Sequence, residues 1–418
     1  MKTFQSADIL LPKNADLTKW SVVACDQYTS EPEYWSAVEK QVSDAPSTLQ
    51  LIFPEIYLNE EASRIEKINQ NMQAYINSGI FKEEKNCMIY VKRTVGGGKI
   101  RHGLIGCVDL EQYDFKKGSG SLIRATEGTV LERIPPRVKI RENAPLELPH
   151  IMILIDDPEK TIIEPLEENL AQMQQLYDFD LMQNSGHLSG YRLTDGQMEC
   201  VYREIDKLGE QNVFHEKYQV SNKPVLQFAV GDGNHSLATA KTCWENVKKS
   251  LSEEEQKTHP ARYALVELVN LHDESLEFEP IHRVVFDVNP EHLLQALFAY
   301  YPEVSYEDNG GQWIGCHFAG MKKDIYVKGS QSNLSVGTLQ NFLDEYLRKN
   351  GGNVDYIHGE EVVTNLSRKE NIIGFYLPNM EKSDLFKTVI LDGALPRKTF
   401  SMGEAWEKRF YMEAKAIR

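Results

Sequence analysis

The amino-acid sequence predicts an α/β (α+β) fold built on a mixed sheet. Short apolar runs bounded by turn residues, typical of buried strands, alternate with stretches whose apolar residues recur every three or four positions, typical of amphipathic helices. The chain has 418 residues, a length at which two or three domains are expected. We place one boundary at residue 288, so that residues 1–288 form the larger region and residues 289–418 a smaller C-terminal α/β region.

In the larger region, turn and capping residues delimit the expected elements. Ser30 and Pro32 mark the start of a helix over 30–42. A hairpin is expected around the glycines at 96–98, which allow positive φ angles. Further expected elements are a strand over 20–28, a helix over 60–80, a strand, proline turn, basic helical stretch and apolar strand within 120–163, a helix over 164–182, and a hairpin over 185–205.

In the smaller region, the same patterns predict helices over 290–300 and 338–349 and strands near 312–318 and 324–328. Ser401 and Glu404 have the spacing of a capping box. A last helix is therefore expected after them, packing back on the larger region.

The stretch LQFAVGDGNHSLATAKTCW, residues 226–244, predicts a buried strand joined to a helix through a polar, glycine-rich loop. The first backbone N–H groups of such a helix have no partner within the helix, and with the helix dipole they attract an anion. Gly231 and Gly233 allow a phosphate to approach the backbone, because they carry no Cβ. The loop is therefore a candidate phosphate site.

The polar residues of this loop leave two interpretations open. Asn234, His235 and Ser236 can add donors to a phosphate, and Asp232 can hold Mg²⁺ or act as a base. In the other interpretation Asp232 caps the helix and His235 makes a structural hydrogen bond. The spacing matches neither a P-loop nor a complete Gly-x-Gly-x-x-Gly, so a P-loop ATPase and a Rossmann dehydrogenase are poor fits.

Composition excludes several classes of protein. The net charge of -16 argues against a sequence-independent grip on nucleic acid or on an anionic membrane. Six scattered cysteines without a Cys-x-x-Cys pair indicate neither a zinc ribbon nor a disulfide framework. No signal peptide and no apolar stretch of about 20 residues is found, so a cytoplasmic location is expected. The eleven histidines show no zinc-binding spacing.

Polar residues at other predicted strand ends are secondary candidates. Asp26 follows an apolar run and could contact a substrate amine or a metal, or cap the next helix. Asp156 and Asp157 fit a turn. His282 and Arg283 could contact a base or phosphate, or make structural hydrogen bonds.

VGDGNHSLATA resembles the Asp-Gly-x-His-Arg signature of the ParB-like superfamily, which includes chromosome-partitioning CTPases, sulfiredoxin and free serine kinases. The wider sequence resembles the family described as domain of unknown function 1015, through VVACDQYTSEPEYW, IRATEGTVLERIPPRVKIRENAPLELPHIMILIDDP, EPIHRVV and LPRKTFSMGEA. The resemblance implies a ParB/sulfiredoxin-like core with large insertions. It also implies that the signature loop holds nucleotide phosphates.

The resemblance assigns roles to individual residues. It makes Gly231, Gly233, Asn234 and Ser236 phosphate-binding, and Asp232 and His235 catalytic. Glu127, in IRATEGT, matches the base of the serine kinases. Asn234 stands where a first histidine is usual and Ser236 where an arginine is usual, so another cation is needed. The candidates for nucleotide or phosphate contact elsewhere in the chain are Arg124, His282, Arg283, Arg397 and Lys398.

We therefore expect a nucleotide-dependent small-molecule kinase that uses Mg²⁺ with ATP or ADP and acts on a hydroxyl, such as that of a free amino acid. A homo-oligomer is compatible with the sequence. The alternatives are a regulatory protein that senses a nucleotide without turnover, and a metal-dependent hydrolase.

Overall fold

A computed structural model describes residues 2–418, and the side chains of residues 58–62 lie outside this description. The chain forms two compact units, one of Met1–Leu276 with Glu404–Arg418, and one of Glu277–Gly403. The sequence placed the junction at residue 288. The contacts place it at Leu276 and return the last residues of the chain to the first unit.

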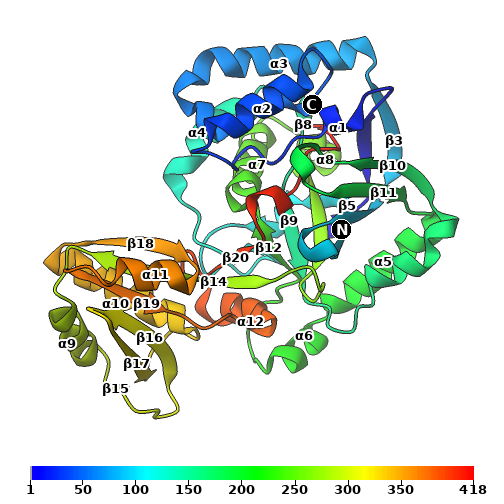
Figure 1. The fold of residues 1–418 in the computed structure, drawn as a ribbon. Helices are drawn as coiled ribbons and strands as arrows, with labels where there is room; N and C mark the ends of the chain where they lie inside the picture. The colour runs from blue at the N-terminus through cyan, green and yellow to red at the C-terminus, as the bar shows by residue number, and fades with distance from the viewer. Residues whose placement is uncertain (1) are drawn as a thin grey trace. The chain divides into compact units, whose positions relative to one another are not determined.

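The first unit is built on a ten-stranded mixed sheet in the order β10-β11-β4-β5-β13-β9-β12-β7-β6, with β1 paired to β5 (Figure 1). Its strands are β1 Phe4–Gln5, β4 Ile89–Thr94, β5 Ile100–Asp109, β6 Tyr113–Asp114, β7 Ile123–Ala125, β9 Met152–Ile155, β10 Gln174–Asp180, β11 His187–Arg192, β12 Phe228–Asp232 and β13 Tyr263–Asn270. Two small sheets pair β2 Ala7–Pro12 with β3 Phe81–Cys87, and β8 Leu146–Glu147 with β21 Lys415–Ala416.

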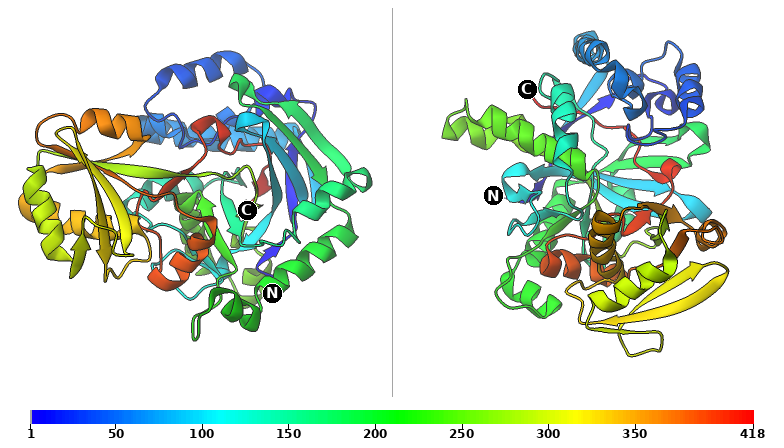
Figure 2. Two further views of the ribbon diagram at one scale, coloured as in Figure 1. Left: turned by 60° about the horizontal axis from the view of Figure 1, so that its bottom comes forward. Right: turned by 90° about the vertical axis from the view of Figure 1, so that its left-hand side faces the viewer.

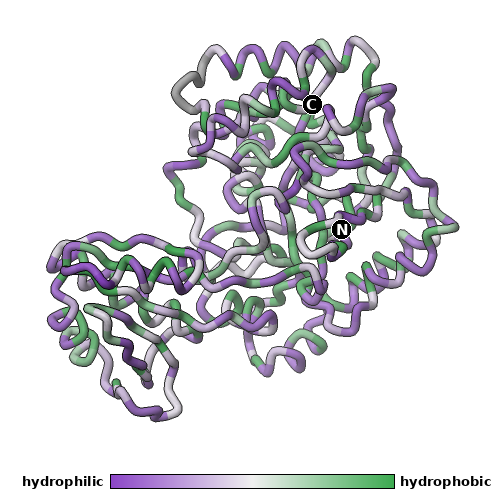
Figure 3. The backbone as a smooth tube through the Cα atoms, in the orientation of Figure 1, coloured by the Kyte–Doolittle hydropathy of each residue, from purple (hydrophilic) through white to green (hydrophobic). Residues whose placement is uncertain are grey.

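The helices of the first unit are α1 Leu17–Trp20, α2 Pro32–Val42, α3 Glu61–Ser78, α4 Ile134–Arg141, α5 Asp195–Leu208, α6 Gln211–Tyr218, α7 Asn234–Lys248 and α8 Glu253–Thr258. Hydrophilic and hydrophobic colours alternate along α3 and α5 in Figure 3, as expected of amphipathic helices. Within residues 2–418, every helix is too short or too polar to span a lipid bilayer.

The large sheet has a hydrophobic core on each face, because side chains alternate along a strand. In β4, Ile89 and Val91 belong to one core and Tyr90 to the other. The first core includes Leu51, Phe53 and the C-terminal residues 410–412, and the second includes the apolar face of α7. The second core also includes Phe228 and Val230 of β12, so it packs against both sides of the β12–α7 junction.

The second unit contains an antiparallel sheet in the order β15-β17-β16-β19-β14-β18, with β20 paired to β14. Its strands are β14 Phe278–Phe286, β15 Glu303–Ser305, β16 Gln312–Phe318, β17 Met321–Lys328, β18 Asn353–His358, β19 Ile372–Tyr376 and β20 Phe400–Met402, and its helices are α9 Pro290–Tyr300, α10 Ser335–Asn350, α11 Glu360–Leu366 and α12 Lys382–Asp392. The helices and strands predicted in this region are confirmed.

The predicted α/β class, the helices over 30–42 and 60–80, the hairpin at 96–98 and the β12–α7 junction are confirmed. The strand predicted over 20–28 is wrong, because only Val23 forms a bridge there, with Phe410. The backbone N–H groups of Val22 and Cys25 donate instead to the side chains of Thr48 and Tyr411. The apolar residues of this segment therefore indicated correctly that it is buried, but not that it forms a strand.

In residues 164–205 a helix followed by a hairpin was predicted, but the structure has a strand pair followed by a helix. Residues 164–172 form a short 3-10 helix, and the strand β10 follows it and pairs with β11. The second half of the predicted hairpin is the helix α5, whose start is fixed by a capping box of Thr194 and Gln197. Tyr177 and Phe179 alternate with exposed residues, the period of a strand.

The predicted C-terminal helix is also wrong. The capping box is made by Glu404 and Glu407 and closes only a 3-10 turn over Ala405–Glu407. The chain then runs extended among elements of the first unit, in red in Figures 1 and 2. Three consecutive residues, 410–412, are buried, which a helix with a single apolar face cannot achieve.

Candidate functional site

Two of the predicted catalytic residues lie at the carboxyl ends of two adjacent parallel strands. β7 pairs with β12 in parallel, with Ala125 opposite Val230. Glu127 follows β7 two residues after Ala125, and Asp232 ends β12 two residues after Val230. Thr126, between them, donates from its hydroxyl to the carbonyl of Val230 at 2.6 Å. Parallel pairing thus joins segments that lie about a hundred residues apart in the chain.

The two glycines of the loop are required by the strand β9, which packs behind it. The pairing of β12 with β9 shifts register between Val230 and Asp232, which places Gly231 in a β-bulge. A Cβ on Gly231 would lie 2.8 Å from Cγ of Leu154. Gly233 has a φ of +78°. The expectation that these glycines serve phosphate approach is therefore incomplete, because neighbouring protein atoms alone explain both.

The first turn of α7 has no side-chain cap. Its N-cap residue is Gly233, and the first intrahelical bond runs from the N–H of Leu237 to the carbonyl of Gly233. The backbone N–H groups of Asn234, His235 and Ser236 therefore have no partner within the helix. Asp232 accepts from the backbone N–H of Gly233, the residue before the helix, at 2.9 Å, and α7 has no side-chain cap, so the interpretation in which Asp232 caps the helix does not describe this structure. The positive end of the helix is open to an anion.

Asp232 forms an ion pair that the sequence did not predict. Nζ of Lys408 lies 3.2 Å from Oδ2 of Asp232. Burial opposes ionisation of Asp232, but the charge of Lys408, with the hydrogen bonds from Lys408 and Gly233, holds the pKa of Asp232 below its ordinary value. Asp232 is therefore an ionised carboxylate with a cation beside it.

His235 lies in a cationic environment supplied by α4, which packs against α7. Burial, followed by the positive charges of Arg137 and Arg133, lowers the pKa of His235 to about 4. Nε2 of His235 accepts from the backbone N–H of Val130 at 3.3 Å. His235 is thus a neutral imidazole at neutral pH, and the permanent charges near it are the guanidinium groups.

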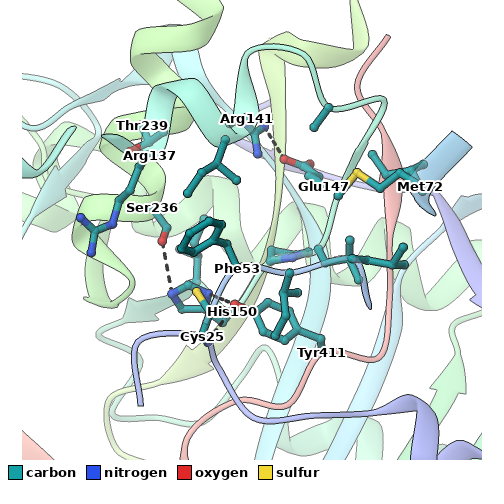
Figure 4. A pocket seen from close by; sticks show the side chains of 18 of the residues that line it. Cys25, Phe53, Met72, Arg137, Arg141, Glu147, His150, Ser236, Thr239 and Tyr411 are labelled. Carbon is teal, nitrogen blue, oxygen red and sulfur yellow. Dashed lines mark hydrogen bonds and ion pairs between the residues drawn. The ribbon is translucent and has the colours of Figure 1, made fainter. Parts of the chain in front are cut away.

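A cavity of about 150 Å³ lies beside this first turn (Figure 4). Much of its wall is apolar and includes Leu51, Ile52, Phe53, Met72, Ile140 and Leu148. Polar groups also line it, among them Cys25, Arg137, Arg141, Glu147, His150, Ser236 and Tyr411. Arg137 is paired with Glu55, and Arg141 with Glu147 at 2.5 Å. A mainly apolar cavity with a few convergent polar groups is typical of a small-molecule site.

A hydrogen-bonded chain runs from α7 to the C-terminal segment. Nε2 of His150 lies 3.2 Å from Oγ of Ser236, and Nδ1 of His150 lies 2.7 Å from the hydroxyl of Tyr411. The backbone N–H of Cys25 donates to the same hydroxyl, and Oδ2 of Asp26 is 3.9 Å from Nε2 of His150. Asp26, predicted to contact substrate, is thus brought to this site.

Cys25 is not a candidate nucleophile in this chain of contacts. Burial, with the negative charge of Asp26, raises the pKa of the Cys25 thiol to about 12. The thiol is therefore protonated at neutral pH.

The C-terminal segment is held in place by a buried ionic network centred on Arg409. Arg409 donates to Glu267, to Glu413 at 2.5 Å, and to the carbonyl of Pro149 at 3.2 Å. Its neighbours along the chain are Lys408 and, two residues on, Tyr411. The network therefore fixes the residues that contact Asp232 and His150.

Arg124 is not brought to the loop. Its guanidinium donates to the carbonyls of Ser121, Pro224 and Val225, each at 2.8 Å. These carbonyls lie at the amino-terminal ends of β7 and β12, opposite the loop. The N–H groups of Arg124 therefore link the two strands, which is a structural role.

The other cationic candidates belong to the second unit. Arg283 is fully buried and donates to carbonyls of Ile281 and Arg397. Nδ1 of the buried His282 accepts from the N–H of Leu377 at 3.2 Å, in line with the structural interpretation of this pair. Arg397 is exposed and paired with Asp344, and Lys398 is exposed. The guanidinium groups of Arg283 and Arg397 both lie over the ring of Tyr356, at 5.2 and 5.9 Å from its centroid.

The residues that sequence reasoning missed are His150, Lys408, Arg133 and Arg137. Arg133, Arg137 and Arg141 recur every four residues, so their alignment on one side of a helix was a readable signal. Lys408 and His150 carried no such signal. Their positions in the site depend on where the fold places the extended C-terminal segment, which carries Lys408, and the residues just before β9, which include His150.

No group of three or more His, Cys, Asp or Glu side chains suited to hold a metal occurs among the described residues. A magnesium ion bound together with phosphates needs only one or two protein carboxylates. Asp232 can supply one, with Glu127 in the adjacent strand extension. The donor chemistry thus fits a magnesium nucleotide.

Comparison with known proteins identifies a family. Residues 7–389 match the model of a family described as "Protein of unknown function (DUF1015)". No curated protein matches the chain at a significant level.

Among solved structures, the chain is similar to three proteins of low identity. A free serine kinase in complex with AMP is 9% identical over 75% of this chain and 92% of that chain, with a TM-score of 0.38. SbnI from Staphylococcus aureus with a C-terminal truncation is 10% identical over 71% and 82%, with a TM-score of 0.36. A conserved hypothetical protein from Pyrococcus furiosus is 10% identical over 73% and 91%, with a TM-score of 0.34. Likeness at this level transfers neither a substrate nor a reaction.

Proposed function

The chain belongs to the family of proteins of unknown function DUF1015, and we propose that it is a nucleotide-dependent small-molecule kinase. The observation that carries the proposal is the uncapped first turn of α7, which lies among Lys408, Arg133 and Arg137 and beside a mainly apolar cavity. An anion site next to a small-molecule cavity is the arrangement that phosphoryl transfer between two ligands needs.

The phosphate end of the proposed site uses backbone donors and fixed charges. Three N–H groups of residues 234–236 and the helix dipole attract phosphate oxygens. Arg137 and Lys408 add permanent positive charge from two other segments, so the arginine that Ser236 lacks is replaced from outside α7.

Magnesium bound with the nucleotide would neutralise charge on the transferred phosphoryl group. Asp232 is the carboxylate that would hold it, with Lys408 moving from Asp232 to the phosphates. Glu127 lies in the extension of the neighbouring parallel strand, where it can act as a base toward the acceptor. The acceptor hydroxyl, as on a free amino acid, would occupy the cavity.

The first test measures the melting temperature of the full chain with ATP, ADP or AMP, each with and without Mg²⁺. We expect an increase with at least one nucleotide, because binding to the folded state stabilises it. Lys408→Met should reduce that increase, since it removes a phosphate cation. Lys249→Met is the matched control, because Lys249 is exposed beyond the opposite end of α7.

No melting shift with any nucleotide would refute the proposal. A shift that Lys249→Met lowers as much as Lys408→Met would refute the assigned location. Phosphorylated product, sought with a panel of hydroxyl-bearing amino acids, would then identify the acceptor.

One observation favours a second candidate, a nucleotide sensor without turnover. Asp232 is already neutralised by Lys408, as in a site that binds phosphate without a metal. A sensor predicts a melting shift that Mg²⁺ does not change and no phosphorylated product, whereas a kinase predicts both a Mg²⁺-dependent shift and product.

A further inference from the structure

Ser236 differs from the other hydroxyl side chains of α7 in what it contacts. Thr239 and Thr242 donate to the carbonyls of the residues four positions earlier, at 2.7 and 2.8 Å. Such bonds are common within helices. Oγ of Ser236 instead lies 3.2 Å from Nε2 of His150, and both side chains line the cavity (Figure 4). One hydroxyl of the first turn is thus directed at a titratable base.

The ring of His150 is held between Tyr411 and Ser236. The hydroxyl of Tyr411 accepts from the backbone N–H of Cys25 at 3.2 Å and is 2.7 Å from Nδ1 of His150. Burial, and then the charge of Cys25 and a hydrogen bond to its sulfur, raise the pKa of Tyr411. In the tautomer in which Nδ1 of His150 donates to the hydroxyl of Tyr411, Nε2 is the acceptor that faces Oγ of Ser236.

This geometry has the parts of an activated nucleophile. The hydroxyl and the base are within hydrogen-bond reach, and a third group orients the base. His150 and Tyr411 are only 7% and 2% exposed, so their positions are fixed by packing. Asp26, 3.9 Å from Nε2, can stabilise the imidazolium that forms when His150 takes a proton.

We infer that Ser236 is itself a phosphoryl acceptor, and this inference rests on the proposed function. Oγ of Ser236 forms a bond to the terminal phosphorus of the bound nucleoside triphosphate, and the bond from that phosphorus to the β-phosphate oxygen breaks. The electron pair leaves with the nucleoside diphosphate, and the proton of Ser236 passes to Nε2 of His150. The product is phosphoserine at position 236.

The surroundings of Ser236 suit this product. A phosphoserine in the first turn of a helix is stabilised by the free N–H groups and the helix dipole. The guanidinium of Arg137 lines the same cavity, and with Arg133 it already acts on the neighbouring His235. In a second step the acceptor oxygen bonds to the phosphorus and the bond to Oγ breaks. Ser236 recovers its proton from His150, and the acceptor hydroxyl gives its own proton to Glu127, the base of the proposed function.

The experiment incubates the full chain with Mg²⁺ and ATP labelled in its terminal phosphate, without acceptor. We expect one phosphoryl group per chain, found on Ser236 by peptide mass spectrometry. Ser236→Ala should abolish the label, and Thr242→Ala should retain it. His150→Gln should slow labelling at least about tenfold, because general bases contribute about 100-fold or more to such steps.

Melting temperatures of the same proteins with ATP separate the two claims. A nucleotide shift in the unchanged chain without label on Ser236 overturns the inference and leaves the proposed function standing. Label that persists in Ser236→Ala, or that maps to another residue, also overturns it. Absence of both shift and label overturns both.

Discussion

Two strands of the large sheet, β9 and β12, each end in acidic residues, yet only one end forms a candidate site. At the end of β9, Asp156 contacts His272 at 2.7 Å, Tyr218 at 2.6 Å and Lys217 at 3.0 Å. Asp157 accepts from the backbone N–H groups of residues 161 and 162. Both carboxylates at the end of β9 are therefore satisfied by hydrogen bonds or ion pairs from neighbouring protein groups.

At the end of β12, Asp232 has Lys408 and its own neighbour Gly233 as partners, and the first turn of α7 keeps its donors free. β9 and β12 are neighbouring antiparallel strands, so their carboxyl ends point in opposite directions along the sheet. The comparison teaches that a carboxylate after an apolar strand marks a site only where nearby donors are left unsatisfied.

The largest expected effect follows from removing the residue that holds the C-terminal segment at the β12 end. Arg409→Met removes the cation that contacts both Glu267 and Glu413, which are each only 1% exposed. We expect the free energy of unfolding to fall by about 3–5 kcal/mol, measured by urea denaturation. Arg397→Met, which breaks an exposed pair, should cost less than about 1 kcal/mol. Equal losses in the two variants would contradict this account.

A pair of matched substitutions tests the difference between the two strand ends directly. Asp156→Asn removes a charge from a satisfied cluster, so it should lower the free energy of unfolding by about 1–3 kcal/mol and leave nucleotide binding unchanged. Asp232→Asn should instead abolish the Mg²⁺ dependence of the nucleotide-induced melting shift. The comparison fails if Asp156→Asn impairs nucleotide binding as strongly as Asp232→Asn.

A smaller effect is expected from the backbone of the β12 end. Gly233→Ala places a Cβ 3.0 Å from Cα of Ile151 at a positive φ, so it should destabilise the chain by about 1–2 kcal/mol in thermal or urea unfolding. Gly128→Ala is the control, because a Cβ there meets open space. An unchanged stability of Gly233→Ala would show that the loop can adopt another conformation.

The smallest effect is a difference in pH dependence between the two ends. Because the pKa of His235 is lowered from 6.5 to about 4, the unfolded chain binds this proton first, and stability falls as the pH drops from about 6.5 to about 4. The pKa of Asp156 is held below 3.8, so its contribution is present above pH 3.8 and is lost as the pH falls further.

His235→Gln should therefore flatten the unfolding free energy between about pH 4 and 6.5, while Asp156→Asn should flatten it only below that window. Urea denaturation at a series of pH values measures both. A His235→Gln variant with the same pH dependence as the unchanged chain would rule out a lowered pKa for His235.

Much of the fold and part of the site could be predicted from the sequence. The period of the apolar residues identified α2, α3, α9 and α10, and the glycine loop located the β12–α7 junction. The strand predicted over residues 20–28 and the helix predicted at the end of the chain were wrong. The apolar residues of both segments are buried by contacts with distant segments rather than by a local repeat. Arg124 and Arg283 could not be assigned from the sequence, since only the structure shows that backbone carbonyls occupy their donors.

The sequence by itself determined which residues form the open helix terminus, because the strand period, the glycines and the helix period are all local properties. Only the tertiary structure decided what surrounds that terminus. Glu127 arrives there through parallel strand pairing, Arg137 through the packing of α4 on α7, and Lys408 through the ionic anchor of Arg409. Electrostatic and hydrogen-bonding partners act through space, so no local pattern can specify them.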